Sequence, residues 1–298
     1  NVALRGCVAQ EGAIGVYLSQ STNITIRHGV FWNNSSFGIQ ALSGVSALVE
    51  NSILGSVWTN SQLFSLGSLV GFYSDYNGIY AGPLTRVGTV PGGEADNLAA
   101  WQSLTGGQDL HSVPAHPQMA NPGPATATES AYDYHLKTEQ TLGRLRPNGQ
   151  RTSDSVSSPL LDAGNPASDA SPEPSPNGGR VNIGRYGGTA EASSALTLPW
   201  IRVISYEDGG SVSNGSVSLI WTAGGISNET AKVEVSVDGG KNWGTSVTSG
   251  VPLTNGLANW VVSGLPDTPA GAWRVVCLEN TNLWAKSTNF FAIRNNPL

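Results

Sequence analysis

The chain has 298 residues and a formal net charge of -6, with 15 basic and 21 acidic side chains and no basic cluster. Nucleic-acid binding requires Lys and Arg gathered in one patch, so this partner is not expected. No apolar run reaches the roughly 20 residues that cross a bilayer, and no membrane span is predicted. The 37 Gly and 17 Pro favour strands and turns, and the length suits two domains.

Residues 1–82 repeat with a period near 22. Arg5, Arg27, Val49 and Tyr73 head matching segments, and Val16, Ile39 and Leu63 mark a second strand in each unit. A period of 20 to 25 residues with short alternating strands is typical of one coil of a parallel β-helix. The sequence therefore predicts about three right-handed coils, with two strands in each.

Alternation within these strands indicates which side chains face inward. Three pairs should stack from coil to coil and form the core: Val2 and Leu4, Ile24 and Ile26, and Ala47 and Val49. Corner positions are expected at Asn23, Asn33, Asn34, Asn51 and Asn77, because Asn tolerates left-handed backbone and can bond an adjacent coil.

The first coil should not end the solenoid, because a bare edge would expose unpaired strands and apolar surface. The sequence begins directly in a strand-like repeat, at Asn1. We therefore expect residues 1–20 to be covered by upstream coils of the same protein or by a neighbouring subunit.

Residues 83–197 read as a loop-rich C-terminal cap of the coils. One short helix is predicted from Leu98, Ala99, Trp101 and Leu104, which Gly106 and Gly107 end. Pro-rich segments on either side predict extended chain with few free N–H groups.

Five phrases carry a resemblance: YSDYNGIY (73–80), NLAAWQSLTGGQDLHSVPAHPQM (97–119), YDYHLK (132–137), SPLLDAGNPASD (158–169) and PNGGRVNIGRYGGTAEAS (176–193). With these, residues 72–192 resemble the C-terminal end of secreted bacterial proteins with parallel β-helix repeats. The resemblance implies a right-handed β-helix with a terminal cap and a secreted, extracellular or cell-surface location. It also places the chain near polysaccharide-degrading systems.

Residues 198–298 change to clean alternation in five or more short strands, which predicts an immunoglobulin-like β-sandwich resembling bacterial modules of that type. Trp221, Trp260 and Trp273 should lie in its core. SVDGGKNW (236–243) fits an Asp-box pattern and occurs once, so it is interpreted as a turn. Cys7 and Cys277 fall in different domains and are expected to be free.

Candidate site residues in the coils are Arg5, Arg27, His28 and Glu50. Arg5 and Arg27 are predicted to stack, with His28 and Glu50 one residue later in successive coils, and this column could edge a uronate-binding groove. The alternative is a solvated ladder on an outward face. No cofactor is predicted, because the coils lack a carboxylate cluster for a metal; Ca²⁺ would be expected only if the parent protein were a lyase.

The leading hypothesis for function is an extracellular or cell-surface structural or adhesive β-helix module that could bind polysaccharide or build a filament. The alternative is the C-terminal fragment of a polysaccharide lyase or glycoside hydrolase whose catalytic coils lie upstream. A third hypothesis has a neighbouring subunit completing the exposed coil end. Catalysis by this chain alone is not predicted.

Overall fold

A computed structural model describes residues 2–123, 132–175, 177–194, 199–207, 209–226 and 228–294. The chain divides into two compact units, Asn1–Leu196 and Thr197–Leu298. The predicted boundary at 197 and 198 lies outside the described residues. Both units are built from strands, and the α-helix among the described residues is α1 (Leu98–Thr105).

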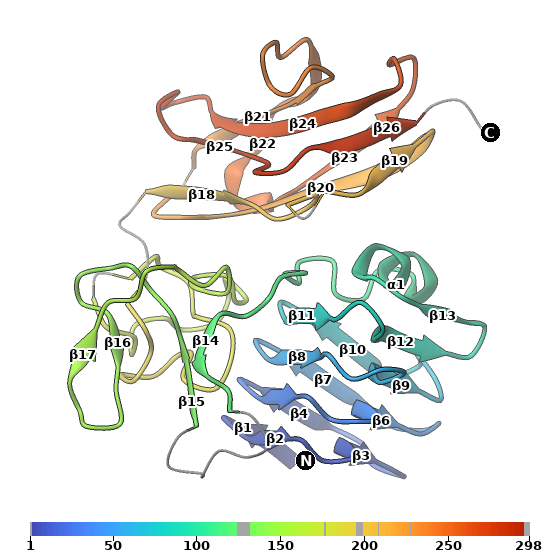
Figure 1. Ribbon diagram of the computed structural model, residues 1–298, viewed down its shortest axis with the longest axis vertical. Helices are drawn as coiled ribbons and strands as arrows, with labels where there is room; N and C mark the ends of the chain where they lie inside the picture. Colours follow the sequence, from blue (N-terminus) through green and yellow to red (C-terminus); the bar gives the residue numbers. More distant parts are fainter. Residues whose placement is uncertain are drawn as a thin grey trace. The chain divides into compact units, whose positions relative to one another are not determined.

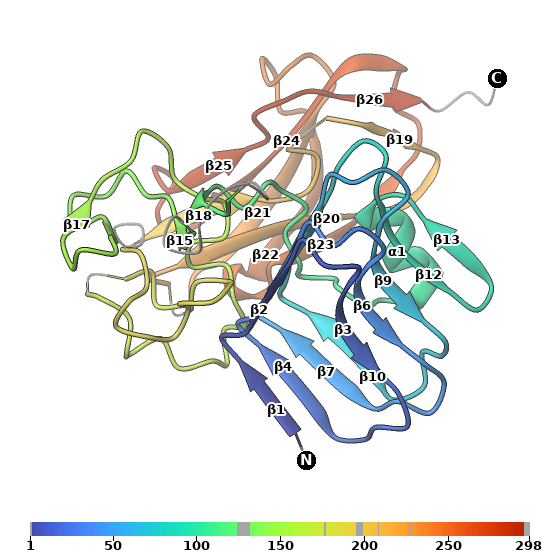
Figure 2. The same ribbon diagram turned by 60° about the horizontal axis from the view of Figure 1, so that its bottom comes forward.

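The first unit is a β-solenoid of about four turns, with three parallel sheets (Figures 1 and 2). The first sheet has the order β1 (Val2–Arg5), β4 (Ile24–Arg27), β7 (Ala47–Glu50) and β10 (Phe72–Asp75). The second sheet contains β2 (Val8–Gln10), β5 (Val30–Trp32), β8 (Ile53–Ser56) and β11 (Gly78–Ala81). The third contains β3 (Ile14–Leu18), β6 (Phe37–Ala41), β9 (Gln62–Leu66) and β12 (Arg86–Val90), and β13 (Gly93–Ala95) adds to it antiparallel.

The predictions of two strands per coil and about three coils were wrong: each coil has three strands, and there are about four turns. The missed strands β2, β5, β8 and β11 have only three or four residues and follow the first strand after a short corner. The residues after the first strand, Gly6, His28, Asn51 and Tyr76, have φ of 62°, 56°, 52° and 55°. Because a single left-handed residue makes this turn, the sequence shows no loop between the two strands, and they read as one strand.

The inward residues were predicted correctly in the second and third coils, whereas in the first coil Val2 is 53% exposed and Leu4 is only partly buried against the core. Val2 lies beside Ile24, Ala47 and Phe72 in successive coils, and Leu4 lies beside Ile26, Val49 and Ser74. Ile26 and Val49 are fully buried, with 0% of their surface exposed. This stacking removes a continuous column of apolar surface from water, which is the main stabilising term of a solenoid.

The predicted heading residues were misaligned. Arg5 pairs in register with Arg27, Glu50 and Asp75, at steps of 22, 23 and 25 residues. In the third sheet Val16 and Ile39 are level with Phe64, not with Leu63. Corners that gain one or two residues shift the register without changing which face is apolar.

The corner Asn residues act in two ways. Asn23, Asn33 and Asn51 adopt left-handed backbone, with φ of 56°, 52° and 52°. Asn34 and Asn77 instead donate from Nδ2 to the carbonyl groups of Ala9 and Val49, both at 3.0 Å. Both expected roles of Asn therefore occur, and Asn33 fills both, because its Oδ1 also accepts the Val57 N–H at 3.2 Å.

The predicted helix is confirmed as α1. Asn97 caps its start by accepting the Ala100 N–H, and Gly106, with φ of 70°, ends it. Trp101 is fully buried and stacks on Phe64 of β9, with 5.1 Å between ring centroids. The helix thus covers one end of the solenoid core.

The rest of the first unit is mainly loop with two short antiparallel pairs. The first pair is β14 (Met119–Asn121) with β15 (Asp133–Leu136), and the second is β16 (Arg144–Leu145) with β17 (Arg151–Thr152). We call residues 160–188 the cap segment, because several of its groups bond to the corners of the first sheet.

The second unit contains two sheets around one core. One sheet contains β18 (Trp200–Val203), β20 (Gly215–Gly224) and β23 (Leu257–Val262). The other contains β19 (Ser211–Ser213), β26 (Phe291–Arg294), β24 (Thr268–Cys277), β21 (Thr230–Ser236), β22 (Thr245–Pro252) and β25 (Trp284–Lys286). Between β22 and β23 lies the 3-10 helix η2 (Leu253–Asn255).

Trp221, Trp260 and Trp273 lie in this core, as predicted, with at most 3% of their surfaces exposed. The Asp-box segment is a turn, as predicted: Asp238 accepts the Asn242 N–H at 2.9 Å, and Gly239 and Gly240 have positive φ. Cys7 and Cys277 are both free. Within the described ranges, no helix has the length and hydropathy to cross a membrane.

Candidate ligand-binding site

A polar ladder follows the first sheet where its strands end. Arg5, Arg27, Glu50 and Asp75 occupy equivalent positions on β1, β4, β7 and β10. Because side chains alternate along a strand and the preceding residues Leu4, Ile26 and Val49 face the core, the ladder faces outward. We call these four residues the charged ladder.

The centre of the charged ladder is an ion pair. Nη2 of Arg27 lies 2.9 Å from Oε2 of Glu50, and Nε donates to the same oxygen at 3.0 Å. The other carboxylate oxygen of Glu50 accepts a hydrogen bond from Nδ2 of Asn165, in the cap segment, at 3.1 Å. Glu50 is 6% exposed, so its charge is held by two partners rather than by water.

Arg5 is differently placed. Its Nη2 lies 3.5 Å from the carbonyl oxygen of Gly188, in the cap segment. The residue is exposed, and no carboxylate of the described residues lies within ion-pair distance of its guanidinium. Its positive charge is therefore available to a ligand.

His28 lies at the corner beside Arg27 and is only 2% exposed. Its Nδ1 is 3.2 Å from the carbonyl oxygen of Gly184. Burial, aided by the positive charges of Arg5 and Arg27, lowers the pKa of His28 to about 4. The ring is therefore neutral at pH 7, and it is held by a backbone group of the cap segment.

These groups line one cavity of about 390 Å³, within the usual range of small-ligand sites. It is lined by Arg5, Arg27, His28, Glu50, Asn165, Ala167, Ser168, Asp169, Pro172, Val181 and Gly188. The coils supply one wall and the cap segment supplies the other. We call this cavity the ladder pocket.

The cap segment is fastened to the coils through Asn51. Its Oδ1 accepts the Asn165 N–H at 2.7 Å, and its Nδ2 donates to Oγ of Ser168 at 3.0 Å. Its carbonyl oxygen accepts the Gly184 N–H at 2.8 Å. One fully buried Asn at a left-handed corner thus positions both ends of the pocket wall.

The structure brings all four sequence-predicted residues together in the ladder pocket. Glu50 is level with Arg27 rather than with His28, which corrects the predicted column. The alternative of a solvated ladder describes only Arg5 and Arg27, because the cap segment covers His28 and Glu50. Ligand binding by these residues stays a prediction.

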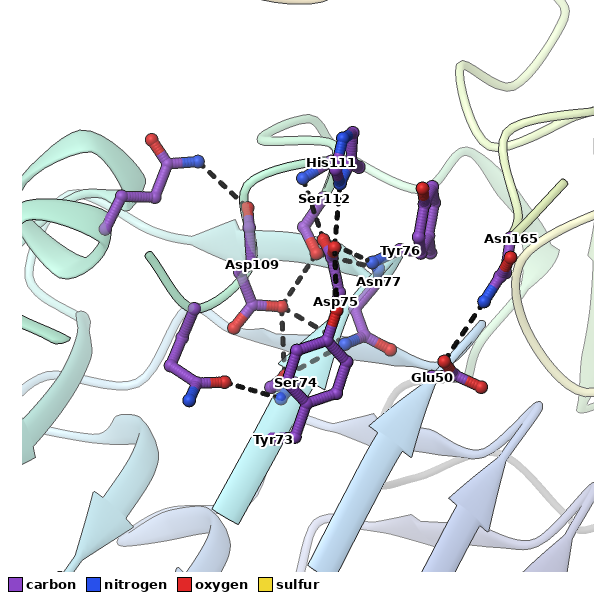
Figure 3. A network of polar contacts seen from close by, with 12 residues as sticks. Glu50, Tyr73, Ser74, Asp75, Tyr76, Asn77, Asp109, His111, Ser112 and Asn165 are labelled. Atoms are coloured by element: carbon purple, nitrogen blue, oxygen red, sulfur yellow. Dashed lines mark hydrogen bonds and ion pairs between the residues drawn. The ribbon is translucent and has the colours of Figure 1, made fainter. Parts of the chain in front are cut away.

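Asp75, the last member of the charged ladder, centres a second polar cluster (Figure 3). Its Oδ1 accepts the N–H groups of Tyr76 and His111, at 2.9 and 2.7 Å. Its Oδ2 lies 2.7 Å from Nδ1 of His111 and 3.3 Å from the Tyr73 hydroxyl. Burial and the nearby Asp75 charge raise the pKa of Tyr73 to about 12, so its hydroxyl stays a donor.

Sequence reasoning missed the Asp75–His111 pair. The two residues are 36 positions apart, and His111 lies outside the repeat from which the candidate residues were chosen. The one signal available was the register, because Asp75 follows Glu50 by one coil. His111 stacks on Tyr76, with 4.7 Å between ring centroids, so this cluster also anchors the loop after α1.

Beneath Asp75 lies the fully buried carboxyl of Asp109, for which burial raises the pKa. It accepts hydrogen bonds from Ser74, Asn77, Ser112 and Trp101, at 2.7 to 3.1 Å. These groups come from the last coil, from α1 and from the loop after α1. Asp109 is therefore a structural residue that joins the two.

Another buried carboxyl stands behind the ladder pocket. Oε1 of Glu173 accepts the N–H groups of Asn182 and Gly188, at 2.8 and 2.7 Å. Its Oε2 is buried without a hydrogen-bond partner, and burial raises the pKa of Glu173 to about 8. Glu173 supports the pocket wall, and its burial favours the protonated, uncharged form.

A shallower groove of about 490 Å³ crosses the same sheet toward the strand starts. It is lined by Val2, Ala3, Asn23, Ile24, Thr25, Ser46, Ala47, Leu48, Gly71 and Tyr73. Tyr73 is 47% exposed, so part of its ring is open to solvent. Among the described ranges, no group of three or more His, Cys, Asp and Glu side chains is arranged to hold a metal ion.

Comparison with known proteins assigns no family. No family model and no curated protein matches the chain. A crystal structure of an engineered protein aligns with 36% of this chain and 22% of its own length, at 19% sequence identity and a TM-score of 0.21. The chain thus spans under a quarter of that structure, and the alignment carries no argument about fold or function.

Proposed function

We propose that the chain is an extracellular or cell-surface glycan-binding module of a bacterial protein, in which a right-handed β-helix presents a binding surface. One observation carries this proposal: the ladder pocket, a polar cavity built jointly by the coils and the cap segment. Its lining offers a guanidinium, an amide, a hydroxyl, an imidazole and carboxylates. Such a mixture of donors and acceptors suits the hydroxyl groups of a sugar.

The second groove extends this surface. Tyr73 and Asp75 occupy outward positions two residues apart on β10, so the groove and the charged ladder share one sheet face. A linear glycan could follow this face and place one sugar against the exposed Tyr73 ring. We propose such an extended contact, which suits a structural or adhesive role better than a closed pocket would.

Two further proposals concern the second unit and the open end of the coils. We propose that its two sheets form an immunoglobulin-like module appended to the solenoid. We also propose that a further coil, from upstream sequence or a neighbouring subunit, pairs with β1, β2 and β3, which are the end strands of their parallel sheets. Stacked coils of this kind could build a filament.

Affinity electrophoresis through gels containing single polysaccharides, both acidic and neutral, tests glycan binding. We expect at least one polysaccharide to retard the chain, with weaker retardation for Tyr73→Ala but not for Tyr73→Phe, which keeps the ring. Arg86→Gln is the control, because Arg86 lies on β12 of the third sheet and not on the proposed binding surface of the first sheet. Its guanidinium pairs with Glu94 and Asp96. Unretarded migration in every gel would refute the proposal.

A second candidate function is a polysaccharide lyase or glycoside hydrolase, which the Asp75–His111 pair favours. A carboxylate that holds Nδ1 of a partly exposed His leaves Nε2 to transfer a proton. Release of unsaturated or reducing products from a polysaccharide, lost in His111→Gln, would establish this function. Binding without product formation would favour the non-catalytic module.

A further inference from the structure

We infer that the ladder pocket selects a sugar residue with one negative charge and a neighbouring hydroxyl group. The guanidinium of Arg5 binds the anionic group, and Nε2 of His28 accepts a hydrogen bond from the hydroxyl. This inference rests on the proposed glycan-binding function and names its ligand class.

The unpaired guanidinium of Arg5 explains the preference of the pocket for a negative charge. Arg27 is already neutralised by Glu50, whose second oxygen is occupied by Asn165. Arg5 is left as the cation of the pocket lining without a carboxylate partner in the described ranges. Asp169, at the rim, adds a negative charge that makes the lining neutral overall, so a ligand with more than one negative charge would meet repulsion.

The tautomer of His28 explains why the ligand should carry a hydroxyl group. A carbonyl oxygen only accepts hydrogen bonds, so the contact with Gly184 requires the proton on Nδ1. Nε2 then carries a lone pair, and no described residue donates to it. Because the ring lines the cavity, this lone pair can accept a hydrogen bond from a ligand hydroxyl.

Gly188 shows that the two groups converge. A Cβ atom placed on Gly188 would lie 2.9 Å from Nη2 of Arg5 and 3.7 Å from Nε2 of His28. Both nitrogen atoms therefore lie near Gly188 and near each other, at the cavity that their residues line. A ligand that contacts both must place its anionic group and its hydroxyl close to each other, as they are on one sugar residue.

The test measures binding of the full chain to three oligosaccharides of equal length by isothermal titration calorimetry. They are an oligogalacturonate, its fully methyl-esterified form and a neutral galactan fragment. We expect the acid to bind at least tenfold more tightly than its ester, because a charge-assisted hydrogen bond is lost on esterification. Arg5→Gln should abolish this preference, whereas Arg86→Gln should keep it.

His28→Asn tests the second contact without disturbing the corner. Asn51 occupies the equivalent corner in the next coil, with φ of 52° against 56° for His28, so Asn suits this backbone. We expect weaker binding of all ligands that occupy the pocket but an unchanged preference for acid over ester. An unchanged thermal midpoint would confirm that Arg5→Gln and His28→Asn remain folded.

The outcomes separate the two proposals. Equal binding of acid and ester, or an unchanged preference in Arg5→Gln, would overturn the anion inference and leave glycan binding intact. Unchanged affinity in His28→Asn would overturn the hydroxyl contact. Failure of all three oligosaccharides, together with unretarded migration in every polysaccharide gel, would overturn both the inference and the proposed function.

Discussion

Glu173→Gln isolates the buried carboxyl behind the ladder pocket. In the folded chain the pKa of Glu173 is raised from 4.5 to about 8, with burial as the main cause. The folded state therefore favours the protonated form, and the unfolded state loses the proton more readily. Stability from this site is complete below pH 4.5, falls as the pH rises, and reaches its minimum above pH 8.

The magnitude follows from the same values. Each pH unit between 4.5 and about 8 corresponds to about 1.4 kcal/mol, so the loss approaches 5 kcal/mol as an upper bound. Glu173 is 4% exposed, which limits the screening by water that would reduce this figure. Gln keeps an acceptor for the Asn182 and Gly188 N–H groups and cannot ionise, so its stability should not fall over this range.

Urea unfolding between pH 5 and pH 9 measures the effect, with hydrogen exchange at the Asn182 and Gly188 amides reporting on the pocket wall. We expect the natural chain to lose protection at these amides as the pH rises, after correction for intrinsic exchange, and Glu173→Gln to keep it. The same pH profile in both proteins would refute the reasoning. It would show that Glu173 ionises in the folded state without cost.

Three further predictions concern the described residues. Folding lowers the pKa of His28 from 6.5 to about 4, so the unfolded chain takes up a proton first as the pH drops. The free energy of unfolding should therefore fall by up to about 3 kcal/mol across that range, and His28→Asn should remove this dependence in acid titrations. Trp101→Ala should cost about 3 to 5 kcal/mol in urea unfolding, because it empties the space against Phe64. Asn51→Ala should speed hydrogen exchange at Asn165, whose N–H loses its side-chain acceptor, and unchanged exchange would contradict the role of the Asn51 side chain in fastening the cap segment.

The solenoid core was predictable because period-two alternation marks inward residues without knowledge of the coil path. Ile24 and Ala47 were placed correctly in the core on that basis. The number of strands in each coil was not predictable, since a left-handed corner such as His28 leaves no gap between two short strands. The helix from Leu98 was predictable because its end signals are local.

The candidate site divides in the same way. Arg5, Arg27, His28 and Glu50 could be grouped from the sequence, because the repeat itself brings equivalent positions of neighbouring coils together. Only the tertiary structure decided that the cap segment closes a pocket over them, since Asn165 contacts Glu50 across 115 positions. Such contacts depend on the path of irregular loops, and a loop has no periodicity from which its partner could be read.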